Sequence, residues 1–578
     1  MDNDPPASSP AAASSPDASA DDSPDASGPD ENKGSAAGSV AAGILSSRIL
    51  GLLRERAQAY FFGVSVYADV LQVAFKSPNL LQNLLGEGTI SAAFIPIYSR
   101  MIEEERYADA GRFAGAIFGL LLAVAGSVSL AGVFLAEPLV GLLAPGYIGD
   151  ASRVATGTLS VNRFALAVEA IRIIFPMAGV LVLSAWALGV LNSHRRFFIP
   201  YVAPALWNVA IIAALFSGAY ALTGTPWAPT ALTDDTLSML LLVACVGALA
   251  GGLLQFLVQL PFVTREMPGF ELSLSTDVDG VQDALDAFGP VVAGRGVAQL
   301  SSYLDVFLAS FLAVGALGAL RYAQLLYLLP ISLFGMSVAA SELPELSRLT
   351  EEKVAAFTAR LRRSMRQIAF LTIPTVGGYL GFGVLLVGAL FQTGQFGAGD
   401  AWLVTLVLGG YALGIVATTL SRLLQNAFYA IGDTKTPAWI AATRVTVSTI
   451  VAVPAMFGLD TIPLGQVVEA GMESSLYLGA LGLSLGASVG AWVELWRLRR
   501  ALRPTLPDAS VPWAAMMRMT GIALVALVPA LGLWYLLPAW DVLIVAPLVT
   551  SAYAAVYLGG AALLGFDELN AWTQRFLG

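Results

Sequence analysis

Residues 113–135, FAGAIFGLLLAVAGSVSLAGVFL, form an apolar run without a single charged side chain. A helix needs about 20 such residues to cross the hydrocarbon core of a bilayer. The run is continuous rather than alternating, and lipid offers the backbone no hydrogen-bond partner, so a helix is favoured over a barrel strand. The stretch therefore predicts one membrane-spanning helix, which we place at 113–143.

Runs of this kind recur along the 578-residue chain, which is 56% hydrophobic and 12% charged, with a mean hydropathy of +0.72. Soluble proteins carry about 25% charged residues, so the composition indicates an all-α polytopic membrane protein. We predict about fourteen transmembrane helices. Their expected ranges are 39–62, 67–99, 113–143, 161–192, 199–222, 237–263, 287–313, 317–346, 358–391, 401–430, 437–458, 475–499, 513–537 and 541–565.

The net charge of −10 originates at the N-terminus, where eight of the 41 acidic residues lie within the first 32 positions. Residues 1–38 are rich in Asp, Ser, Pro and Ala, which predicts a disordered acidic tail. A solvated tail is the simpler interpretation, and a partner-binding tail is the alternative. It has no basic segment before an apolar core, so we do not expect a secretory signal.

Cys245 and His194 are the only cysteine and histidine in the sequence. They allow neither a disulfide within the chain nor a Cys/His metal centre. The chain also lacks a G-x-x-x-x-G-K-[ST] loop for ATP phosphates. We therefore expect a transporter rather than an enzyme, without metal, cofactor or nucleic-acid partner, driven by a gradient, the membrane potential or removal of the substrate.

Basic residues gather in alternate loops, which are expected on the cytoplasmic side. An even number of spans then places both termini in the cytoplasm. The loop bases are Arg100, Arg106, Arg112, Arg195, Arg196, Arg265, Arg348, Lys353, Arg360, Arg362, Arg363, Arg366, Lys435, Arg497, Arg499, Arg500 and Arg503.

Two short segments, FIPIYSR at 94–100 and ELPELSR at 342–348, share their Pro, Ser and Arg positions. Pro200 and Pro437 likewise open the fifth and the eleventh expected helices. Copies six helices apart point the same way across the membrane, which predicts two parallel six-helix lobes with a substrate path between them. The predicted divisions are an N-terminal lobe at 39–263, an acidic cytoplasmic linker at 264–286, a C-terminal lobe at 287–499 and two extra helices within 500–578.

Ionisable side chains inside the expected spans cost about 2.5–3.5 kcal/mol each on insertion scales, so they mark cavities and pathways. Arg48, Arg54 and Lys76 lie deep in the first two helices. Because the guanidinium fork suits phosphate oxygens, we predict a cationic cavity for a phosphate-bearing substrate. Nearer the span ends, an ion pair or a snorkelling side chain is the simpler interpretation, and this applies to Arg56, Arg163 and Arg295.

These charges belong to a longer ordered pattern. Residues 47–55, SRILGLLRE, resemble the S-R-x-L-G-x-x-R-[DE] opening of the MurJ (MviN) family, within the MOP superfamily of exporters. Further matches follow in order as far as residue 437. They are Phe62-Gly63, Ala68-Asp69, AFKSPNLL at 74–81, Glu87-Gly88, AFIP at 93–96, Arg196-Phe197, Pro200, Pro204, Asn208, LASFL at 308–312, Tyr322-Ala323-Gln324, Pro330, FYA at 428–430 and DTKTP at 433–437.

The resemblance implies fourteen helices, two lobes, and inward- and outward-open states. It implies translocation of lipid II, the undecaprenyl-pyrophosphate-linked peptidoglycan precursor, across the cytoplasmic membrane, with cell-wall synthesis enzymes as possible partners. Arg48 and Arg54 would contact the pyrophosphate, and Lys76 and Asp69 would belong to the same substrate-binding site. Asp69 would also matter for the transport cycle. The last two helices would offer a groove for the polyprenyl tail.

The sequence departs from the family at three positions that usually carry arginine, now Gln82, Asn83 and Leu325. Arg321 lies four residues before Leu325, on the same helix face, and is expected to substitute in binding. The departures keep open a transporter of another lipid-linked saccharide or amphiphile. A membrane scaffold for cell-wall enzymes is a third hypothesis, but a scaffold has no need of Arg48 and Arg54 deep in the bilayer.

A second departure concerns ion coupling. Some relatives bind sodium through an Asn and an Asp of the eleventh helix, and Ser448 and Ala452 stand at those positions here. Only Asp305 is left of that pattern as a candidate for ion coupling.

Overall fold

The computed structural model describes residues 29–336, 354–468, 475–508, 510–537 and 540–569, with side chains outside 29–42, 293–302 and 335–336. Throughout these ranges the regular structure is helical, apart from one isolated β-bridge between Pro463 and Tyr477. The predicted all-α class is therefore confirmed.

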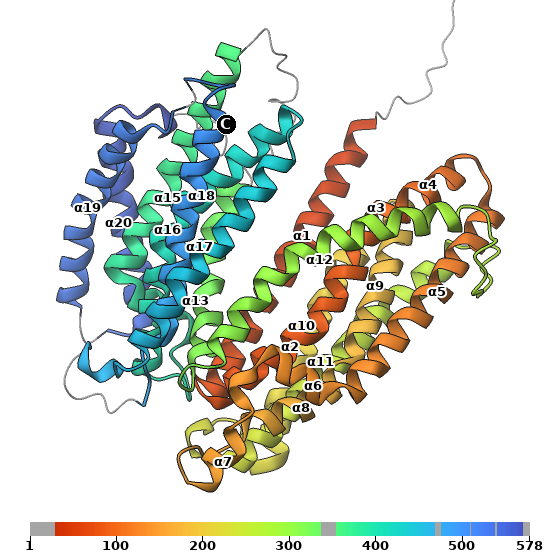
Figure 1. Cartoon of the computed structure of the whole chain (residues 1–578), viewed down its shortest axis with the longest axis horizontal. Coiled ribbons are helices and arrows are strands. Elements are labelled where there is room, and N and C mark those ends of the chain that lie inside the picture. The colour runs from red at the N-terminus through yellow and green to blue at the C-terminus, as the bar shows by residue number, and fades with distance from the viewer. Residues whose placement is uncertain (1–28, 337–353, 469–474, 509, 538–539, 570–578) are drawn as a thin grey trace, which may run out of the picture.

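The first half of the chain forms an N-terminal lobe that ends with α11 (Figure 1). Its elements are α1 (Pro29–Phe62), α2 (Val66–Leu85), α3 (Glu87–Ala93), α4 (Ile95–Glu103), α5 (Tyr107–Phe134), α6 (Ala136–Leu143), η1 (Pro145–Tyr147), α7 (Asp150–Ala155), α8 (Arg163–Ile174), α9 (Pro176–Ser193), α10 (Phe198–Thr223), η2 (Pro229–Ala231) and α11 (Asp234–Arg265).

The second half forms a C-terminal lobe, and the last two helices pack against its α15. The elements are α12 (Val281–Ala309), α13 (Ala316–Pro330), the π-helical turn η3 (Ile331–Met336), α15 (Val354–Phe391), α16 (Ala398–Ala430), α17 (Lys435–Leu459), η5 (Leu464–Gln466), α18 (Gly479–Leu502), α19 (Trp513–Leu536) and α20 (Val542–Leu563). The predicted division at 39–263, 264–286, 287–499 and 500–578 stays a prediction, as does the segment 342–348, which lies outside the described residues.

The first helix is longer than the sequence predicted. α1 begins at Pro29, so residues 29–38 are helical although we expected them in the disordered tail. Proline suits the first position of a helix, whose N–H has no partner in any case. The rest of the expected tail lies outside the described residues.

The second expected helix, 67–99, is divided into α2, α3 and α4. α2 ends at Gly86, which has a non-helical backbone, and Pro96 lies in the first turn of α4, where the missing N–H is tolerated. α12 begins at Val281, inside the linker predicted at 264–286. Neither boundary could be predicted from the apolar runs, because helix ends depend on the local backbone rather than on hydrophobicity.

Ten of the described helices are long and apolar enough to cross a membrane. They coincide with ten of the expected spans and make the chain a multi-pass membrane protein. The expected spans at 39–62, 67–99, 287–313 and 475–499 fall on α1, α2 to α4, α12 and α18, which are less apolar. The count of fourteen stays a prediction.

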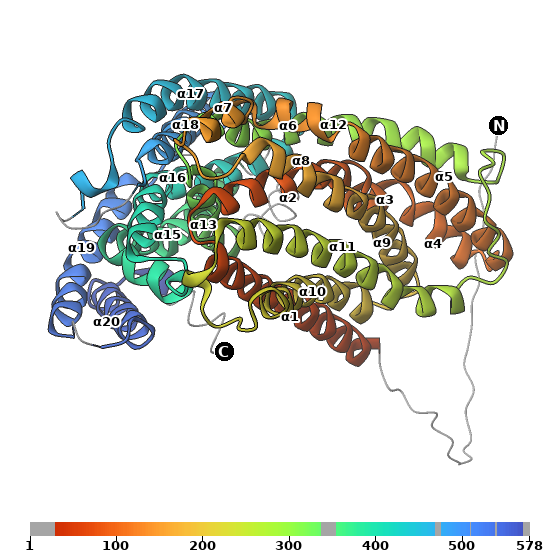
Figure 2. The same ribbon diagram turned by 90° about the horizontal axis from the view of Figure 1, so that it is seen from below.

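The two lobes meet at one end and diverge at the other, and α12 runs along the N-terminal lobe until it reaches α13 (Figures 1 and 2). One apolar core contains residues of both lobes. A second core joins the C-terminal lobe to α19 and α20, and a third joins the N-terminal lobe to the first turn of α12. The lobes therefore share a core only where they meet.

Backbone groups of α1 and the following loop bond across this meeting point, which we call the lobe seam. The amide of Gln395 donates to the carbonyl of Tyr60 at 2.9 Å, and the amide of Val64 donates to Asp400 at 3.1 Å. Arg56 donates to the carbonyls of Ala389 and Leu390 in the last turn of α15, at 2.7 Å each. Carbonyls at a helix C-terminus lack intrahelical partners, so Arg56 satisfies them from the other lobe.

Candidate functional site

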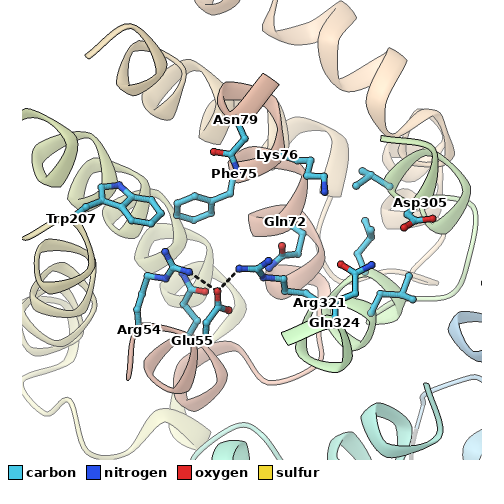
Figure 3. Close-up of a pocket in the computed structure, with 14 residues that line it drawn as sticks. Arg54, Glu55, Gln72, Phe75, Lys76, Asn79, Trp207, Asp305, Arg321 and Gln324 are labelled. Atoms are coloured by element: carbon cyan, nitrogen blue, oxygen red, sulfur yellow. Dashed lines mark hydrogen bonds and ion pairs between the residues drawn. The ribbon is translucent and has the colours of Figure 1, made fainter. Parts of the chain in front are cut away.

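A cavity of about 130 Å³ lies between the lobes, close to the seam (Figure 3). Both lobes contribute to its wall, through α1, α2 and α10 on one side and α12 and α13 on the other. Its lining residues are Arg54, Glu55, Gln58, Gln72, Phe75, Lys76, Asn79, Trp207, Asp305, Val306, Leu317, Leu320, Arg321 and Gln324. Several polar residues of α1, α2 and α12 line this cavity, which explains in part why these helices are less apolar than the others.

Two arginines from different lobes share one carboxylate oxygen in this cavity, a group that we call the cavity cluster. Arg54 Nη2 lies 2.5 Å from Glu55 Oε1, and Arg321 Nη2 lies 2.6 Å from the same atom. The guanidinium of Arg54 also lies over the ring of Trp207, 4.6 Å from its centroid. The cluster therefore carries two cations against one anion.

The cavity cluster is incompletely satisfied. Arg54 Nε and Glu55 Oε2 are buried, and neither has a hydrogen-bond partner among the described residues. A buried charge without a partner is costly, and an anion beside Arg54 and Arg321 would offset the excess positive charge. The arrangement can bind the oxygens of a phosphate or pyrophosphate.

Lys76 and Asp305 face the same cavity from α2 and α12 (Figure 3). The hydroxyl of Tyr303 donates to the backbone carbonyl of Lys76 at 3.0 Å, and the Lys76 ammonium lies 5.8 Å from the centre of that ring. Lys76 thus adds a third cation to the wall, and Asp305 adds a second acid.

A larger cavity of about 420 Å³ adjoins the first and shares four of its lining residues, including Arg54 and Arg321. It is lined mainly by the N-terminal lobe, with amides from Gln82, Asn208 and Gln255 on its wall. Amides donate and accept hydrogen bonds, as the hydroxyl groups of a sugar require. The two cavities together suit an anionic group attached to a polar headgroup.

The structure places Arg48 differently from our expectation. Its side chain is exposed, and it lines neither cavity. Six residues turn about 240° around a helix, so Arg48 and Arg54 cannot lie on one face of α1. Ser47, seven residues before Arg54, lies on the same face as Arg54 and lines the second cavity.

Asp69 also lies outside both cavities, although we grouped it with the binding residues. It is 1% exposed, and its carboxylate accepts the amides of Gly315 at 2.7 Å and Gly318 at 2.9 Å. These amides open α13, where unpaired N–H groups favour a negative charge. Gly315 has φ +90° and no space for a Cβ beside Val64. Asp69 therefore ties α2 to α13 at the lobe seam.

Other intramembrane charges form ion pairs. Arg163 binds Asp150 through two nitrogens, at 2.6 and 3.1 Å, which agrees with the simpler interpretation for that residue. Arg444 pairs with Glu494 at 2.8 Å within the C-terminal lobe. Neither pair lines the cavities beside the cavity cluster. The side chain of Arg295 lies outside the described residues.

The positions that depart from the family pattern divide between wall and core. Gln82 lines the second cavity, whereas Leu325 packs against the shared core. At the expected sodium positions, Ala452 is buried and Ser448 packs against Gly490. Among the described residues, no group of three His, Cys, Asp or Glu side chains could hold a metal ion.

Sequence reasoning missed part of this site. Trp207 carries no charge to single it out, and Glu55 appears in the sequence analysis only as the last residue of the motif at 47–55. The amides of Gln58, Gln72 and Asn79 interrupt otherwise apolar helix faces. Such polar interruptions were the available signal, because a polar side chain in lipid is expensive.

This chain is similar in sequence to one family of known proteins. The family described as "Lipid II flippase MurJ" matches residues 58–551. The probable lipid II flippase MurJ of Rhizobium tropici is 32% identical over 418 residues, covering 72% of this chain and 74% of that protein. The lipid II flippase MurJ of Burkholderia cenocepacia is 30% identical over 470 residues, covering 80% and 83%.

Solved structures agree on the fold. A lipid II flippase MurJ in an inward closed conformation superimposes with a TM-score of 0.67 at 22% identity, covering 91% of this chain and 99% of that one. An inward-facing multidrug transporter of the MATE family, in the MOP superfamily, gives 0.53 at 16% identity, covering 80% and 96%. With the family match extending over most of its length, the chain belongs to the MurJ family.

Proposed function

We propose that this protein translocates lipid II across the cytoplasmic membrane by alternating access. The observation that carries the proposal is the cavity cluster, in which Arg54 and Arg321 share one carboxylate at the wall of a cavity between two lobes. A pyrophosphate would supply the missing negative charge, and bidentate contacts suit the guanidinium fork. Lys76 would add a third cationic contact, and the amides would bind the sugar.

The contacts of the lobe seam support an inward-open state in this structure. The lobes meet at the end where α7 lies, and diverge at the end that carries the loop between α4 and α5 (Figure 1). That loop contains Arg106, one of the loop bases. Loops rich in Arg and Lys favour the cytoplasm, so both termini and the open end would face that side. Transport would require Asp69 to leave α13 and Arg56 to leave α15 as the lobes rock.

A groove of about 340 Å³ between α15 and α20 supports the binding of a polyprenyl tail. Its wall is almost entirely apolar and includes Phe370, Phe382, Tyr553 and Tyr557. A hydrocarbon chain that lies on such a surface buries apolar area, which is favourable. The tail would lie here while the headgroup occupies the cavities.

A second candidate is the transport of a different polyprenyl-linked saccharide. The observation that favours it is the amide of Gln82 on the cavity wall, where the family usually has an arginine. The charge available to a pyrophosphate is correspondingly smaller. Contacts with cell-wall synthesis enzymes stay a prediction from the family resemblance.

The test is a reconstituted flipping assay with the full chain in liposomes of defined composition. Lipid II and an undecaprenyl-pyrophosphate carrying an unrelated sugar are supplied separately, and their exposure on each leaflet is measured. We expect faster flipping of lipid II. Faster flipping of the other lipid would establish the second candidate, and no flipping of either would refute both.

A further inference from the structure

A second charged pocket, of about 500 Å³, lies far from the cavity cluster at the start of α15. It is formed by one face of α15 and by the segment that follows α20, at the end of the molecule where the lobes diverge (Figure 1). Its lining residues are Ala359, Arg362, Arg363, Arg366, Gln367, Asp567 and Glu568. No step of the proposed transport cycle uses them.

The pocket holds both signs of charge in separate places. Arg362 and Arg363 are exposed on α15, whereas Glu568 is only 6% exposed. Oε1 of Glu568 accepts a hydrogen bond from Arg366, but Oε2 is buried without a partner among the described residues. A buried carboxylate oxygen of this kind requires a donor. The pocket thus offers donors for a phosphate and one unsatisfied acceptor for a cation.

Apolar surface continues from this pocket along the same face of α15. Residues three and four positions apart share a helix face, and Phe370 and Leu371 follow Arg366 and Gln367 at that spacing. Both residues line the apolar groove, at the end nearest the start of α15. A ligand that fills the charged pocket can therefore rest hydrocarbon chains beside it.

We propose that this pocket binds a bilayer phospholipid whose headgroup carries a primary ammonium next to its phosphate. The phosphate accepts hydrogen bonds from Arg362 and Arg363, and the ammonium donates to Glu568 Oε2. The mixed charge of the wall complements a zwitterionic headgroup better than a purely anionic one. Basic pockets between membrane helices bind the phosphates of lipid head groups, which supports the role of Arg362 and Arg363.

The experiment uses the purified full chain in detergent with equimolar phosphatidylethanolamine, phosphatidylcholine and phosphatidylglycerol of identical acyl chains. Retained lipid is counted by native mass spectrometry. We expect phosphatidylethanolamine to be retained about tenfold over phosphatidylcholine, whose quaternary ammonium has no N–H to donate to a charged acceptor. Stepwise N-methylation should lower retention in parallel.

Three variants localise the effect. Glu568→Gln should make phosphatidylethanolamine and phosphatidylcholine equal, while the double variant R362Q/R363Q should lower retention of both about tenfold. Arg503→Gln, an exposed arginine after α18, should behave as the unmodified protein. The N-methylation series on the unmodified protein keeps the test valid if Glu568→Gln fails to fold.

Several results would overturn the proposal. Equal retention of the two zwitterionic lipids would exclude recognition of the ammonium, and preferential retention of phosphatidylglycerol would show an anion site. Displacement of the bound lipid by lipid II would assign the pocket to the substrate route. Flipping of lipid II is measured separately, so failure here leaves the transport proposal to its own assay.

Discussion

Two arginine–carboxylate groups are buried in the N-terminal half of this protein, and they differ in how completely they are paired. Arg163 meets Asp150 through two nitrogens, and its guanidinium lies 4.2 Å from the centre of the Tyr147 ring. In the cavity cluster, Arg54 shares Glu55 with an arginine of the other lobe and retains an unpaired nitrogen. The first group is closed, and the second opens onto a cavity.

The difference teaches that burial of a charge does not by itself indicate function. A buried pair with complete hydrogen bonding stabilises one arrangement, because separating it leaves an uncompensated charge. A buried cluster with one cation in excess is complete only when an anion arrives. Two features distinguish the structural role from the binding role: the ratio of cations to anions in the group, and whether the group adjoins a cavity.

The largest expected effect is on the closed pair. Arg163→Ala should lower the free energy of unfolding by about 3–5 kcal/mol, because it leaves the buried carboxylate of Asp150 without its main partner. The measurement is thermal or denaturant unfolding of the purified protein. Arg153→Ala is the matched control, since Arg153 lies 3.3 Å from the same carboxylate but is exposed. Equal losses from both variants would contradict the distinction.

Arg54→Ala should act on transport instead. We expect flipping of lipid II to fall about tenfold to a hundredfold, because hydrogen bonds from a charged donor to the pyrophosphate are lost. The melting temperature should change little, since Glu55 keeps Arg321 as a partner. Arg48→Ala, on another face of α1, should reduce flipping less. A larger loss in Arg48→Ala would show that the cavity cluster is not the binding site.

Glu55→Gln sharpens the comparison by removing the shared anion. The cavity becomes more positive, so we expect tighter binding of lipid II and slower release, with turnover lowered about tenfold or less. Binding and flipping must be measured separately on the same preparation. Weaker binding would indicate that Glu55 contacts the substrate directly rather than holding the two arginines.

The smallest expected effect is that of pH on His194, which lies beyond the end of α9. Its Nε2 lies 3.1 Å from the hydroxyl of Tyr98, and burial lowers the pKa of its imidazole from the ordinary 6.5. The unfolded chain then binds the proton more strongly, so stability is present above about pH 6.5 and declines as the pH falls.

The loss at acid pH should be small, because Glu266 opposes part of the shift in the pKa of His194. His194→Gln should flatten this part of the pH profile in thermal unfolding. An unchanged profile would assign the acid sensitivity to carboxyl groups elsewhere.

The helical class and most spans could be predicted from the sequence because apolar length alone decides them. The run at 113–135 needs no partner to be read as a membrane helix, and Arg54 could be identified as a candidate because a charge in such a run is expensive. Arg48 satisfies the same criterion, yet it is exposed and lines neither cavity. The energetic cost of a charge inside a membrane span identifies an unusual residue. It does not say whether the side chain faces the cavity, because that depends on the helix face on which the residue lies.

Residues far apart in the sequence set the remaining features. Asp69 shows no sequence signal for its partners, because Gly315 and Gly318 reach it only when the lobes meet. The sharing of Glu55 by two arginines likewise depends on α1 and α13 facing the same cavity.

The sequence by itself determined that this chain spans the membrane repeatedly and carries intramembrane cations, since apolar length and charge are properties of each segment alone. Only the tertiary structure decided which cations are neutralised and which still lack a counter-charge. The physical reason is that the energy of a buried charge depends on its partners within a few ångströms. In the cavity cluster, the two arginines that share Glu55 come from opposite lobes of the fold.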